Sequence, residues 1–484
     1  MEITNLAPQP LWQYFSQLNA IPRASKKEEK AVAFVEAFGR QLGLETIKDA
    51  VGNVCIKKPA TAGMEDRQTV ILQSHLDMVH QKNGDTVFDF DTQGIEMYVD
   101  GDWVRARGTT LGADNGIGVA TIMAVLASKD VPHPAIEAMF TIDEETGMTG
   151  AMQLDPAPYT GTILLNLDTE EDDEITIGCA GGLDTNTSGS YQQVPAVAGG
   201  AAYDITIKGL LGGHSGMDIN RGRGNANKLM NRLLYKVRQS VDLQLATLDG
   251  GSLRNAIPRE SRATVVVPGA DKARFEELAQ AFAAVLKEEY STVETALAVE
   301  ITPAATPASV MEAAYFDKLL RALYAAPNGV FRMSPDVPGL VEASNNIAKV
   351  TVKDGKFITQ SLQRSNVDST KEDVALAVRS AFENMGCEVV QAGGYPGWKP
   401  NPASPILEVL LSLHGKHFEQ QPKVGAIHAG LECGILGSLL KGPDMISFGP
   451  TIRGAHSPNE CAQISSVQKF YGFLLDILKG IPKK

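Results

Sequence analysis

Short apolar runs alternate with segments of helical spacing through the first 185 residues of the chain. Residues 68–79, 135–143 and 161–168 are brief apolar runs rich in strand-forming residues, and they predict buried strands. Residues 28–43 carry apolar side chains at helical spacing, and the apolar stretch 116–129 predicts a buried helix. Strands alternating with helices are typical of a mostly parallel sheet covered by helices, so we expect an α/β fold here.

The pattern changes after about residue 186. Residues 188–202 are small and weakly patterned, and we expect them to form a linker. Helical spacing at 225–240 and 370–386 then alternates with strand patterns such as 262–268. The order predicts two successive α+β units. A second linker is expected in the glycine- and proline-rich stretch 393–402, after which helix and strand patterns resume.

Composition and charge restrict the class of protein. Hydrophobic residues make up 43% of the chain and charged residues 21%, as in ordinary globular proteins. At 484 residues two domains are the default expectation. The net charge of −13 and the pI of about 5.2 argue against non-specific binding to nucleic acid or to an anionic membrane. We therefore expect neither as a partner.

Three further features favour a cytoplasmic location. The N-terminal segment MEITNLAPQPLWQYF lacks a basic region followed by an apolar run, so no secretory signal is predicted. No apolar run approaches the roughly 20 residues that span a bilayer. The five cysteines are scattered without a C-x-x-C pair, which indicates reduced thiols and no disulfide framework or thiolate metal site.

Seven ionisable side chains stand near the ends of these predicted elements. In chain order they are His75, Asp77, Asp114, Glu144, Glu145, Asp168 and His456. In open α/β sheets ligands bind at the carboxyl ends of the strands, and His75, Glu145 and Asp168 lie at or after such ends. Two histidines and three carboxylates suit a pair of divalent zinc-type ions that share one carboxylate. The series therefore predicts a dinuclear metal centre and a hydrolase.

Each part of this series also fits an ordinary structural interpretation. Asp77 could hold the second ring nitrogen of a metal-bound His75, or the two could form a surface pair at a strand end. Asp114, in an Asp-Asn-Gly sequence, fits a turn or a helix N-cap as well as a bridging carboxylate. Glu144 and Glu145 could be a solvated pair of charges. These alternatives remain open for the single motifs.

The order of the ligands also predicts the domain organisation. Because His456 completes the set, the C-terminal part must rejoin the first part. We expect residues 1–185 and 393–484 to form one discontinuous α/β domain, with 186–392 inserted as a second domain. H-E-x-x-H, G-x-S-x-G, G-x-x-x-x-G-K and an intact G-x-G-x-x-G are absent, so nucleotide, flavin and serine-hydrolase chemistry lack their usual motifs.

Taken together, the segments SHLDMV, LGADNGIG, TIDEETG, LLNLDTEE and GAHSPNE resemble the motifs of the carnosinase-type co-catalytic zinc metallopeptidases. The resemblance covers essentially the whole chain, from IPRASKKEE near the start to GAHSPNE near the end. It implies a mostly parallel, mixed-sheet zinc-peptidase catalytic domain with an inserted α+β lid domain. The lid could also serve dimerisation, and a homodimer is expected.

The resemblance assigns the metal ligands. Asp114 would bridge two divalent ions, which are expected to be Zn²⁺, with Mn²⁺ or Co²⁺ able to substitute. His75 and Asp168 would complete the coordination of one ion. Glu145 and His456 would complete that of the other.

The resemblance also assigns catalytic and substrate-binding residues. Asp77 would orient His75, and Glu144 would be the general base. In the lid, His214 would support the tetrahedral oxyanion and Asn255 would lie near the substrate. Arg364 would receive the free C-terminal carboxylate, for which a guanidinium fork is suited.

The activity expected from this resemblance is hydrolysis of small dipeptides, Xaa-His and other unblocked dipeptides among them, including β-alanyl-histidine. Two alternatives use the same chemistry: an N-acyl-amino-acid deacylase and an aminotripeptidase. A third belongs to another class, a catalytically silent scaffold. Retention of Glu144 argues against it, because a silent relative has no chemical reason to keep a general base.

Overall fold

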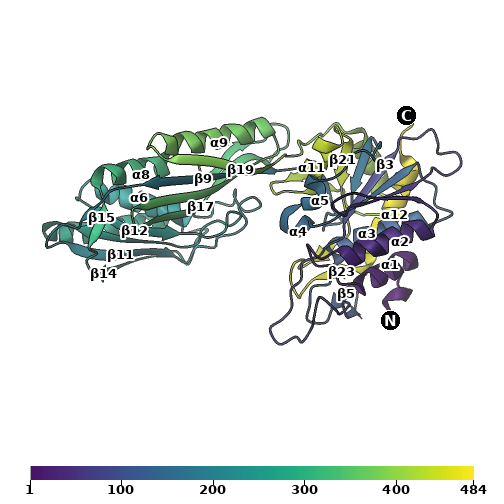
Figure 1. Ribbon diagram of the computed structural model, residues 1–484, viewed down its shortest axis with the longest axis horizontal. Coiled ribbons are helices and arrows are strands. Elements are labelled where there is room, and N and C mark those ends of the chain that lie inside the picture. The colour runs from purple at the N-terminus through teal and green to yellow at the C-terminus, as the bar shows by residue number, and fades with distance from the viewer. Residues whose placement is uncertain (1) are drawn as a thin grey trace. The chain divides into compact units, whose positions relative to one another are not determined.

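The computed structural model describes residues 2–484, and the chain divides into two compact units (Figure 1). The first unit comprises the chain up to Gly178 together with Pro400–Ala426 and Leu431–Lys484. The second comprises Cys179–Lys399 and the short segment Ile427–Gly430. The sequence pattern placed the boundaries at 185/186 and 392/393 and gave no sign of the short return at 427–430.

The first unit is built on an eight-stranded mixed sheet in the order β1-β2-β6-β3-β7-β21-β8-β20. The central strands β6, β3, β7 and β21 are parallel, whereas β1, β2 and β8 pair antiparallel with their neighbours. The predicted α/β class is thus confirmed, with the parallel pairs in the middle of the sheet. The strands are β1 Glu45–Lys48, β2 Val54–Lys58, β3 Val70–His75, β6 Ile136–Thr141, β7 Ile163–Asn166, β8 Glu174–Cys179, β20 Lys423–Ile427 and β21 Asp444–Ser447.

A smaller four-stranded sheet in the same unit has the order β22-β23-β5-β4. It consists of β4 Met97–Asp100, β5 Trp103–Ala106, β22 Ile452–Arg453 and β23 Cys461–Gln463. The turn between β22 and β23 contains His456, so this small sheet is the support from which that residue projects.

Helices enclose the larger sheet. They are η1 Ile3–Asn5, α1 Gln9–Asn19, α2 Glu29–Gln41, α3 Ala113–Ala127, α4 Glu144–Gly147, α5 Thr149–Met152, α10 Pro405–His414, α11 Glu432–Leu439 and α12 Ile464–Gly480. Helix α3 is apolar on all sides and buried throughout from Ile117 to Leu126, as expected for a helix at the centre of a large unit. Residues of α2, α3, α10 and α12 form one apolar core with the strands.

The second unit contains one antiparallel sheet of nine strands, in the order β14-β11-β13-β12-β17-β18-β9-β19 with β16 paired to β17. A separate two-stranded ladder joins β10 and β15. The strands are β9 Gly181–Ser190, β10 Gln193–Pro195, β11 Ala201–Lys208, β12 Gln244–Gly250, β13 Ser261–Val267, β14 Ala298–Ala304, β15 Ser309–Met311, β16 Gly329–Met333, β17 Val341–Lys353, β18 Lys356–Ser365 and β19 Glu388–Tyr395.

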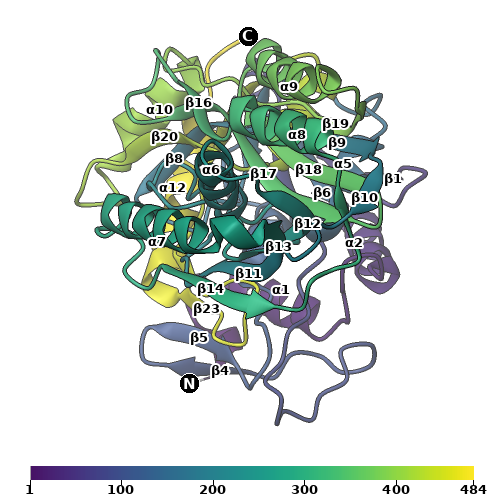
Figure 2. The ribbon, with the colours of Figure 1, turned by 90° about the vertical axis from the view of Figure 1, so that its left-hand side faces the viewer.

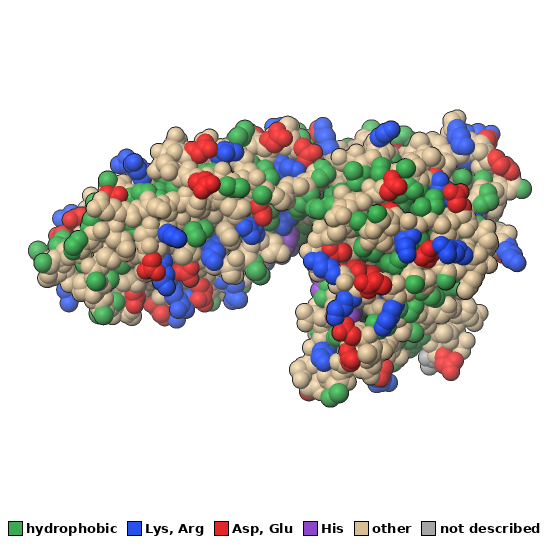
Figure 3. All heavy atoms as spheres, in the orientation of Figure 1, with side chains coloured by type: hydrophobic (Ala, Val, Ile, Leu, Met, Phe, Trp, Pro, Cys, Tyr) green, Lys and Arg blue, Asp and Glu red, His purple; other side chains and the backbone are tan. Residues whose placement is uncertain are grey.

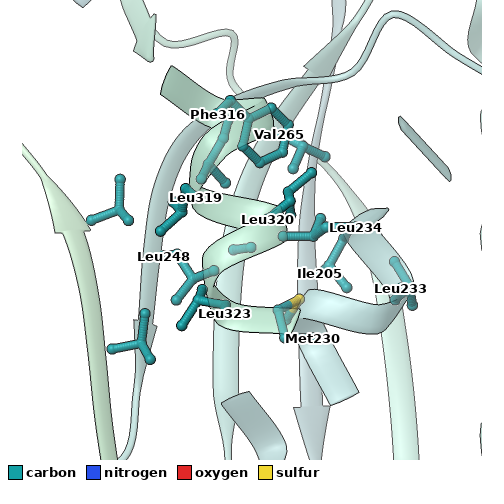
Figure 4. Packing of buried hydrophobic residues seen from close by; sticks show 14 of the residues in the cluster. Ile205, Met230, Leu233, Leu234, Leu248, Val265, Phe316, Leu319, Leu320 and Leu323 are labelled. Carbon is teal, nitrogen blue, oxygen red and sulfur yellow. The ribbon is translucent and has the colours of Figure 1, made fainter. Parts of the chain in front are cut away.

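Four long helices pack on one face of this antiparallel sheet (Figure 2). They are α6 Ala226–Arg238, α7 Lys272–Glu289, α8 Ala313–Ala325 and α9 Asp368–Glu383, and the short η2 Gly269–Asp271 precedes α7. Phe316 and Leu320 of α8, Met230 of α6 and the strand residues Ile205 and Val265 belong to one buried apolar cluster, in which Phe316 lies beside Val265 (Figure 4). Burial of each such side chain contributes about 1.5–3 kcal/mol, so this helix-on-sheet layer is the main source of the unit's stability.

The linkers predicted at 188–202 and 393–402 are wrong in part: the first contains the end of β9, all of β10 and the start of β11, and the second contains the end of β19. Residues up to Ser190 complete β9, which lies between β18 and β19 and buries Thr185 and Thr187. The sequence did not indicate this strand because its side chains are mostly glycine, serine and threonine. Its pairing is supplied by long neighbouring strands, not by an apolar pattern of its own.

Charged side chains of both signs are interspersed on the face drawn in Figure 3. Exposed ion pairs such as Lys27–Asp91, whose Nζ and Oδ1 atoms are 2.7 Å apart, contribute little to stability because water and salt screen them. Stability therefore comes from the buried cores. Within residues 2–484, no helix combines the length and the apolar character needed to cross a bilayer.

Candidate active site

The carboxyl ends of the central parallel strands bring the predicted metal ligands together in the first unit. His75 is the last residue of β3, Glu145 lies in the short helix α4 after β6, and Asp168 follows β7 by two residues. Asp114 enters from the start of α3, and His456 from the turn between β22 and β23. The side chain of His75 is buried, those of Asp114, Glu145 and Asp168 are at most 11% exposed, and that of His456 is 54% exposed.

Asp114 lies between the two histidines. Its Oδ1 atom is 3.1 Å from His75 Nε2, and its Oδ2 atom is 3.2 Å from His456 Nε2. His75 Nε2 is also 3.4 Å from Asp168 Oδ1, and His456 Nε2 is 2.9 Å from Glu145 Oε2. The two oxygens of Asp114 thus face two different pairs of donors. This geometry fits the predicted carboxylate shared by two cations.

The N-cap interpretation of Asp114 is not supported by the structure. Asp114 and Asn115 have non-helical backbone within the range of α3, and the hydrogen bonds of the Asp114 side chain within residues 2–484 are with His75 and His456, not with backbone N–H groups of the helix. Asp114 itself has an extended backbone, with φ −79° and ψ 110°. Its carboxylate points toward the histidines instead of back onto the helix.

The electrostatics of this cluster favour cations. Burial raises the pKa of Glu145 and of Asp168, and the hydrogen bonds that His456 donates to Asp114 and Glu145 raise its pKa to about 11. Burial opposes ionisation of Asp114, but its bonds with His456 and His75 hold its pKa well below the usual range. A cation bound among these carboxylates would offset the cost of burying their negative charge next to one another.

The donor set fits a pair of divalent ions. Ligand atoms of His75, Asp114 and Glu145 all lie within 4.8 Å of one another. Glu145 Oε1 is buried and has no hydrogen-bond partner, as expected for an oxygen whose partner is a cation. Nitrogen and carboxylate oxygen donors without thiolates match zinc-type ions.

Asp77 connects His75 with the residues that follow β6. Its Oδ1 atom is 3.3 Å from His75 Nδ1 and accepts a hydrogen bond from the Glu144 backbone N–H at 3.0 Å. Its Oδ2 atom accepts from the backbone of Glu145 at 3.2 Å and from the Ser25 hydroxyl at 2.7 Å. Asp77 thereby fixes the ring of His75 and the start of α4 at the same time. A surface pair is excluded, because Asp77 is fully buried.

Glu144 stands beside Glu145 at the start of α4, where its environment suits proton transfer. Burial, with the nearby carboxylates of Asp168, Glu432 and Glu145, raises the pKa of Glu144 well above its ordinary value, although His75 opposes this. A carboxylate with a raised pKa is a stronger base than one in water. Glu144 and Glu145 are therefore not the solvated pair of charges that remained an alternative interpretation of the sequence.

The predicted lid residues His214 and Arg364 lie together in the second unit. Arg364, on β18, donates from Nε to Ser215 Oγ and from Nη1 to the Tyr395 hydroxyl, both at 3.2 Å. Its Nη2 atom is 3.3 Å from His214 Nε2. Sequence reasoning did not indicate Ser215 or Tyr395. Tyr395 stands in the glycine-rich stretch expected to be a linker, and Ser215 directly follows His214.

Asn255 is placed next to this cluster through its backbone. Its carbonyl oxygen accepts a hydrogen bond from the Ser215 N–H at 2.8 Å, while the residue is exposed. Its side chain makes no contact with His214 or Arg364 that would assign it a task. A substrate-binding role for the Asn255 side chain stays a prediction.

The fold and the cluster together define the class of the protein as a metal-dependent peptidase with a second, antiparallel-sheet unit. Residues 205–294, within that unit, match the peptidase dimerisation domain of the M20 peptidases. Over its full length the chain is 43% identical to the cytosol non-specific dipeptidase of Escherichia coli K12, with 100% of both proteins covered. The chain therefore belongs to the M20 peptidase family, in the group of that dipeptidase.

Solved structures agree with this assignment. The aminoacylhistidine dipeptidase from Vibrio alginolyticus is 44% identical and superposes with a TM-score of 0.95, covering 100% of this chain and 99% of the other. Aminopeptidase PepT from Bacillus cereus is 16% identical, with a TM-score of 0.57 and coverage of 98% and 99%. The latter shares the fold alone.

Proposed function

We propose that the chain is a dinuclear-metal dipeptidase that cleaves Xaa-His and other unblocked dipeptides, β-alanyl-histidine among them. Dipeptidase activity as such follows from its membership of the family, and the 43% and 44% identical relatives carry dipeptidase names. The observation that carries the mechanism is the placement of Asp114, whose two oxygens face His75 and His456 separately.

Each residue of the first unit has a proposed task in the reaction. His75, Asp114, Glu145, Asp168 and His456 would hold two divalent ions, with zinc proposed and Mn²⁺ or Co²⁺ able to replace it. Such ions, when bound, polarise the scissile carbonyl and lower the pKa of water. Glu144 would take the proton of the attacking water and return it to the leaving amine. Asp77 would keep the His75 ring in place.

The polar cluster of the second unit supplies donors for negatively charged groups of the substrate. Arg364 is the proposed receptor for the C-terminal carboxylate. His214 is proposed to donate to the oxyanion that forms on the carbonyl oxygen. Both side chains are held by their neighbours in the fold, which favours a binding site whose geometry is already formed before substrate arrives.

A homodimer in the cytosol is proposed as the setting of this activity. The match to a peptidase dimerisation domain at 205–294 supports self-association, and the E. coli relative is named a cytosol protein. Light scattering coupled to size exclusion tests the assembly: the mass should be twice the 51.7 kDa of one chain. A mass of one chain at micromolar concentration would overturn the dimer.

The activity is tested with a panel of dipeptides, tripeptides and N-acyl amino acids, before and after chelation. We expect hydrolysis of unblocked dipeptides, loss on chelation, and recovery with Zn²⁺, Mn²⁺ or Co²⁺. Cleavage of acylated amino acids alone would favour a deacylase, and preferred cleavage of tripeptides an aminotripeptidase. Absence of metal-dependent hydrolysis of every amide would favour a silent scaffold.

A further inference from the structure

A buried carboxylate, Glu460, lies directly behind the loop that presents Asp114. Glu460 is 2% exposed and stands four residues after His456. Its two oxygens accept four backbone hydrogen bonds from consecutive residues. Oε2 accepts from Leu111 N at 2.7 Å and Gly112 N at 2.9 Å, and Oε1 accepts from Ala113 N at 2.7 Å and Asp114 N at 3.2 Å.

Arg23 holds the same loop from another side and joins it to the end of β3. Its Nη2 atom donates to the Gly112 carbonyl at 2.6 Å, and its Nη1 atom donates to the carbonyls of Leu76 and Asp77 at 3.0 and 3.1 Å. The side chain is fully buried. A Cβ atom at Gly112 would lie 2.4 Å from Arg23 Nη2, and Gly112 has φ +70°, so only glycine fits there.

These contacts connect three segments that carry metal ligands. Arg23 links the residues after His75 to the loop before α3, and Glu460 links that loop to the segment of His456. The carboxylate of Asp114 has to lie close to both His75 and His456. The backbone that carries it is held by Glu460 on one side and by Arg23 on the other. Within residues 2–484, neither Arg23 nor Glu460 forms a hydrogen bond with the side chain of a proposed metal ligand. The bonds described above all go to backbone groups.

We propose that Glu460, with Arg23 opposite it, is a positioning residue for the metal centre. By fixing the backbone from Leu111 to Asp114, it sets the carboxylate of Asp114 between His75 and His456. This inference rests on the proposed metal-dependent function. Loss of partners that orient a ligand typically weakens metal affinity about 10- to 100-fold, and that is the effect expected here.

Glu460→Gln is the informative variant because the amide has one acceptor oxygen and one donor group. It can accept from one pair of the four N–H groups, while its NH₂ faces the other pair, donor against donor. Glu460→Asp keeps the charge opposite Arg23 and shortens the reach by one methylene. It is measured alongside as the milder change.

Glu137→Gln is the matched control. Glu137 is 4% exposed, and its carboxylate also accepts a set of hydrogen bonds from one loop, namely from the backbone of Thr160 and Gly161 and from the Thr160 hydroxyl. It lies near the start of β6, at the opposite end of that strand from Glu144 and Glu145. Its loss removes comparable hydrogen bonds from a loop without metal ligands.

The test is titration of the chelator-treated full-length protein with Zn²⁺ by calorimetry, and with Co²⁺ by visible absorption. We expect E460Q to bind both ions about 10- to 100-fold more weakly than wild type, with a changed Co²⁺ spectrum, and E137Q to match wild type. E460D should shift in the same direction, and it decides the matter if E460Q does not fold.

Two results would overturn the inference. Wild-type affinity and spectrum in folded E460Q or E460D would show that Glu460 does not position the site, and so would an equal loss of affinity in E137Q. In both cases the metal-dependent function would stand. If the wild-type chain itself bound no divalent ion, the proposed function would fail, and this inference with it.

Discussion

The Nε2 atom of His214 lies 3.3 Å from Nη2 of Arg364, and the two atoms form a pair of donors. His214 Nδ1 accepts hydrogen bonds from the backbone N–H groups of Gly216 and Met217, at 3.2 and 3.1 Å. Its ring proton is therefore on Nε2. Burial and the charge of Arg364 lower the pKa of His214 to about 4, so the ring is neutral at pH 7. Two N–H groups thus converge without an acceptor between them, as a site for an anionic oxygen requires.

Loss of the His214 donor should slow the chemical step more than it weakens substrate binding. An oxyanion forms only in the transition state, so we expect His214→Ala to lower kcat about 10²- to 10³-fold with little change in KM. Steady-state kinetics on one dipeptide measures both constants. His417→Ala, at a histidine paired with Asp476 in the first unit, is the control and should retain activity. A raised KM with unchanged kcat would show that His214 binds the ground state instead.

Arg364 should determine whether the enzyme distinguishes a free C-terminal carboxylate from an amide. Hydrogen bonds to a charged group are worth about 1.5–3 kcal/mol, so Arg364→Met should lower kcat/KM for a dipeptide about 10- to 100-fold. The corresponding dipeptide amide, which lacks the charge, should be affected far less. Arg379→Met, at a partly exposed arginine that pairs with Glu383 and also donates to Gln391 and the Val389 carbonyl, is the control. Equal losses on the acid and the amide would contradict the assignment.

The adjacent residues Glu144 and Glu145 should fail in different ways when their charge is removed. Glu144→Gln should bind both metal ions as wild type does and lose about 10²- to 10⁴-fold in kcat, because a proton acceptor is missing. Glu145→Gln should lose metal affinity, because one oxygen next to His456 no longer carries charge. Metal content by mass spectrometry and kcat at saturating metal separate the two effects. Weak metal binding in E144Q would make Glu144 a ligand.

Part of the proposed metal-ligand set could be placed from sequence because its positions depend on local features, while the role of each ligand came from the resemblance of the motifs to those of a known family. His75 and Asp168 follow apolar runs, and parallel strands bring their carboxyl ends to one edge without any knowledge of side-chain contacts. Glu460 and Arg23 could not be assigned in the same way. Both side chains hold backbone groups of a loop that is distant in sequence. Every residue type except proline has a backbone N–H group, so the residue types in the loop do not indicate which side chain will bind it.

The parts of the fold that sequence did not predict share a physical cause. The strand β9 contains glycine, aspartate and asparagine residues, which are depleted in strands, and it is held by its pairing with β18 and β19 on either side. The return of Ile427–Gly430 to the second unit is likewise maintained by partners from elsewhere in the chain. The Ala180 N–H lies 3.1 Å from the Ile427 carbonyl and 2.9 Å from that of Ala429, and His428 Nε2 lies 2.7 Å from the Ser344 hydroxyl. The conformation of β9 and the position of Ile427–Gly430 are therefore determined by tertiary contacts and not by the local sequence pattern.

Glu432, at the start of α11, should make the stability of the metal-free protein depend on pH. Its Oε2 atom accepts from Gln73 Nε2 and the Thr141 hydroxyl, both at 2.7 Å, while Oε1 is buried without a partner. Burial, reinforced by Asp168 and Asp77 and opposed by His75, raises the pKa of Glu432 from 4.5 to about 8. The folded state thus holds a proton that the unfolded state releases.

The sign of the effect follows from this difference. A carboxyl whose folded pKa is raised stabilises the fold fully below pH 4.5, and its contribution is lost as pH rises toward 8. The loss is on the order of a few kcal/mol. Glu432→Gln keeps the shape and one acceptor but cannot ionise, so its melting temperature relative to wild type should rise between pH 5 and pH 8. Calorimetric melting in chelator measures this. Glu383→Gln, at an exposed residue of α9, should show no such change, and parallel pH profiles for wild type and E432Q would show that Glu432 is ionised in the fold.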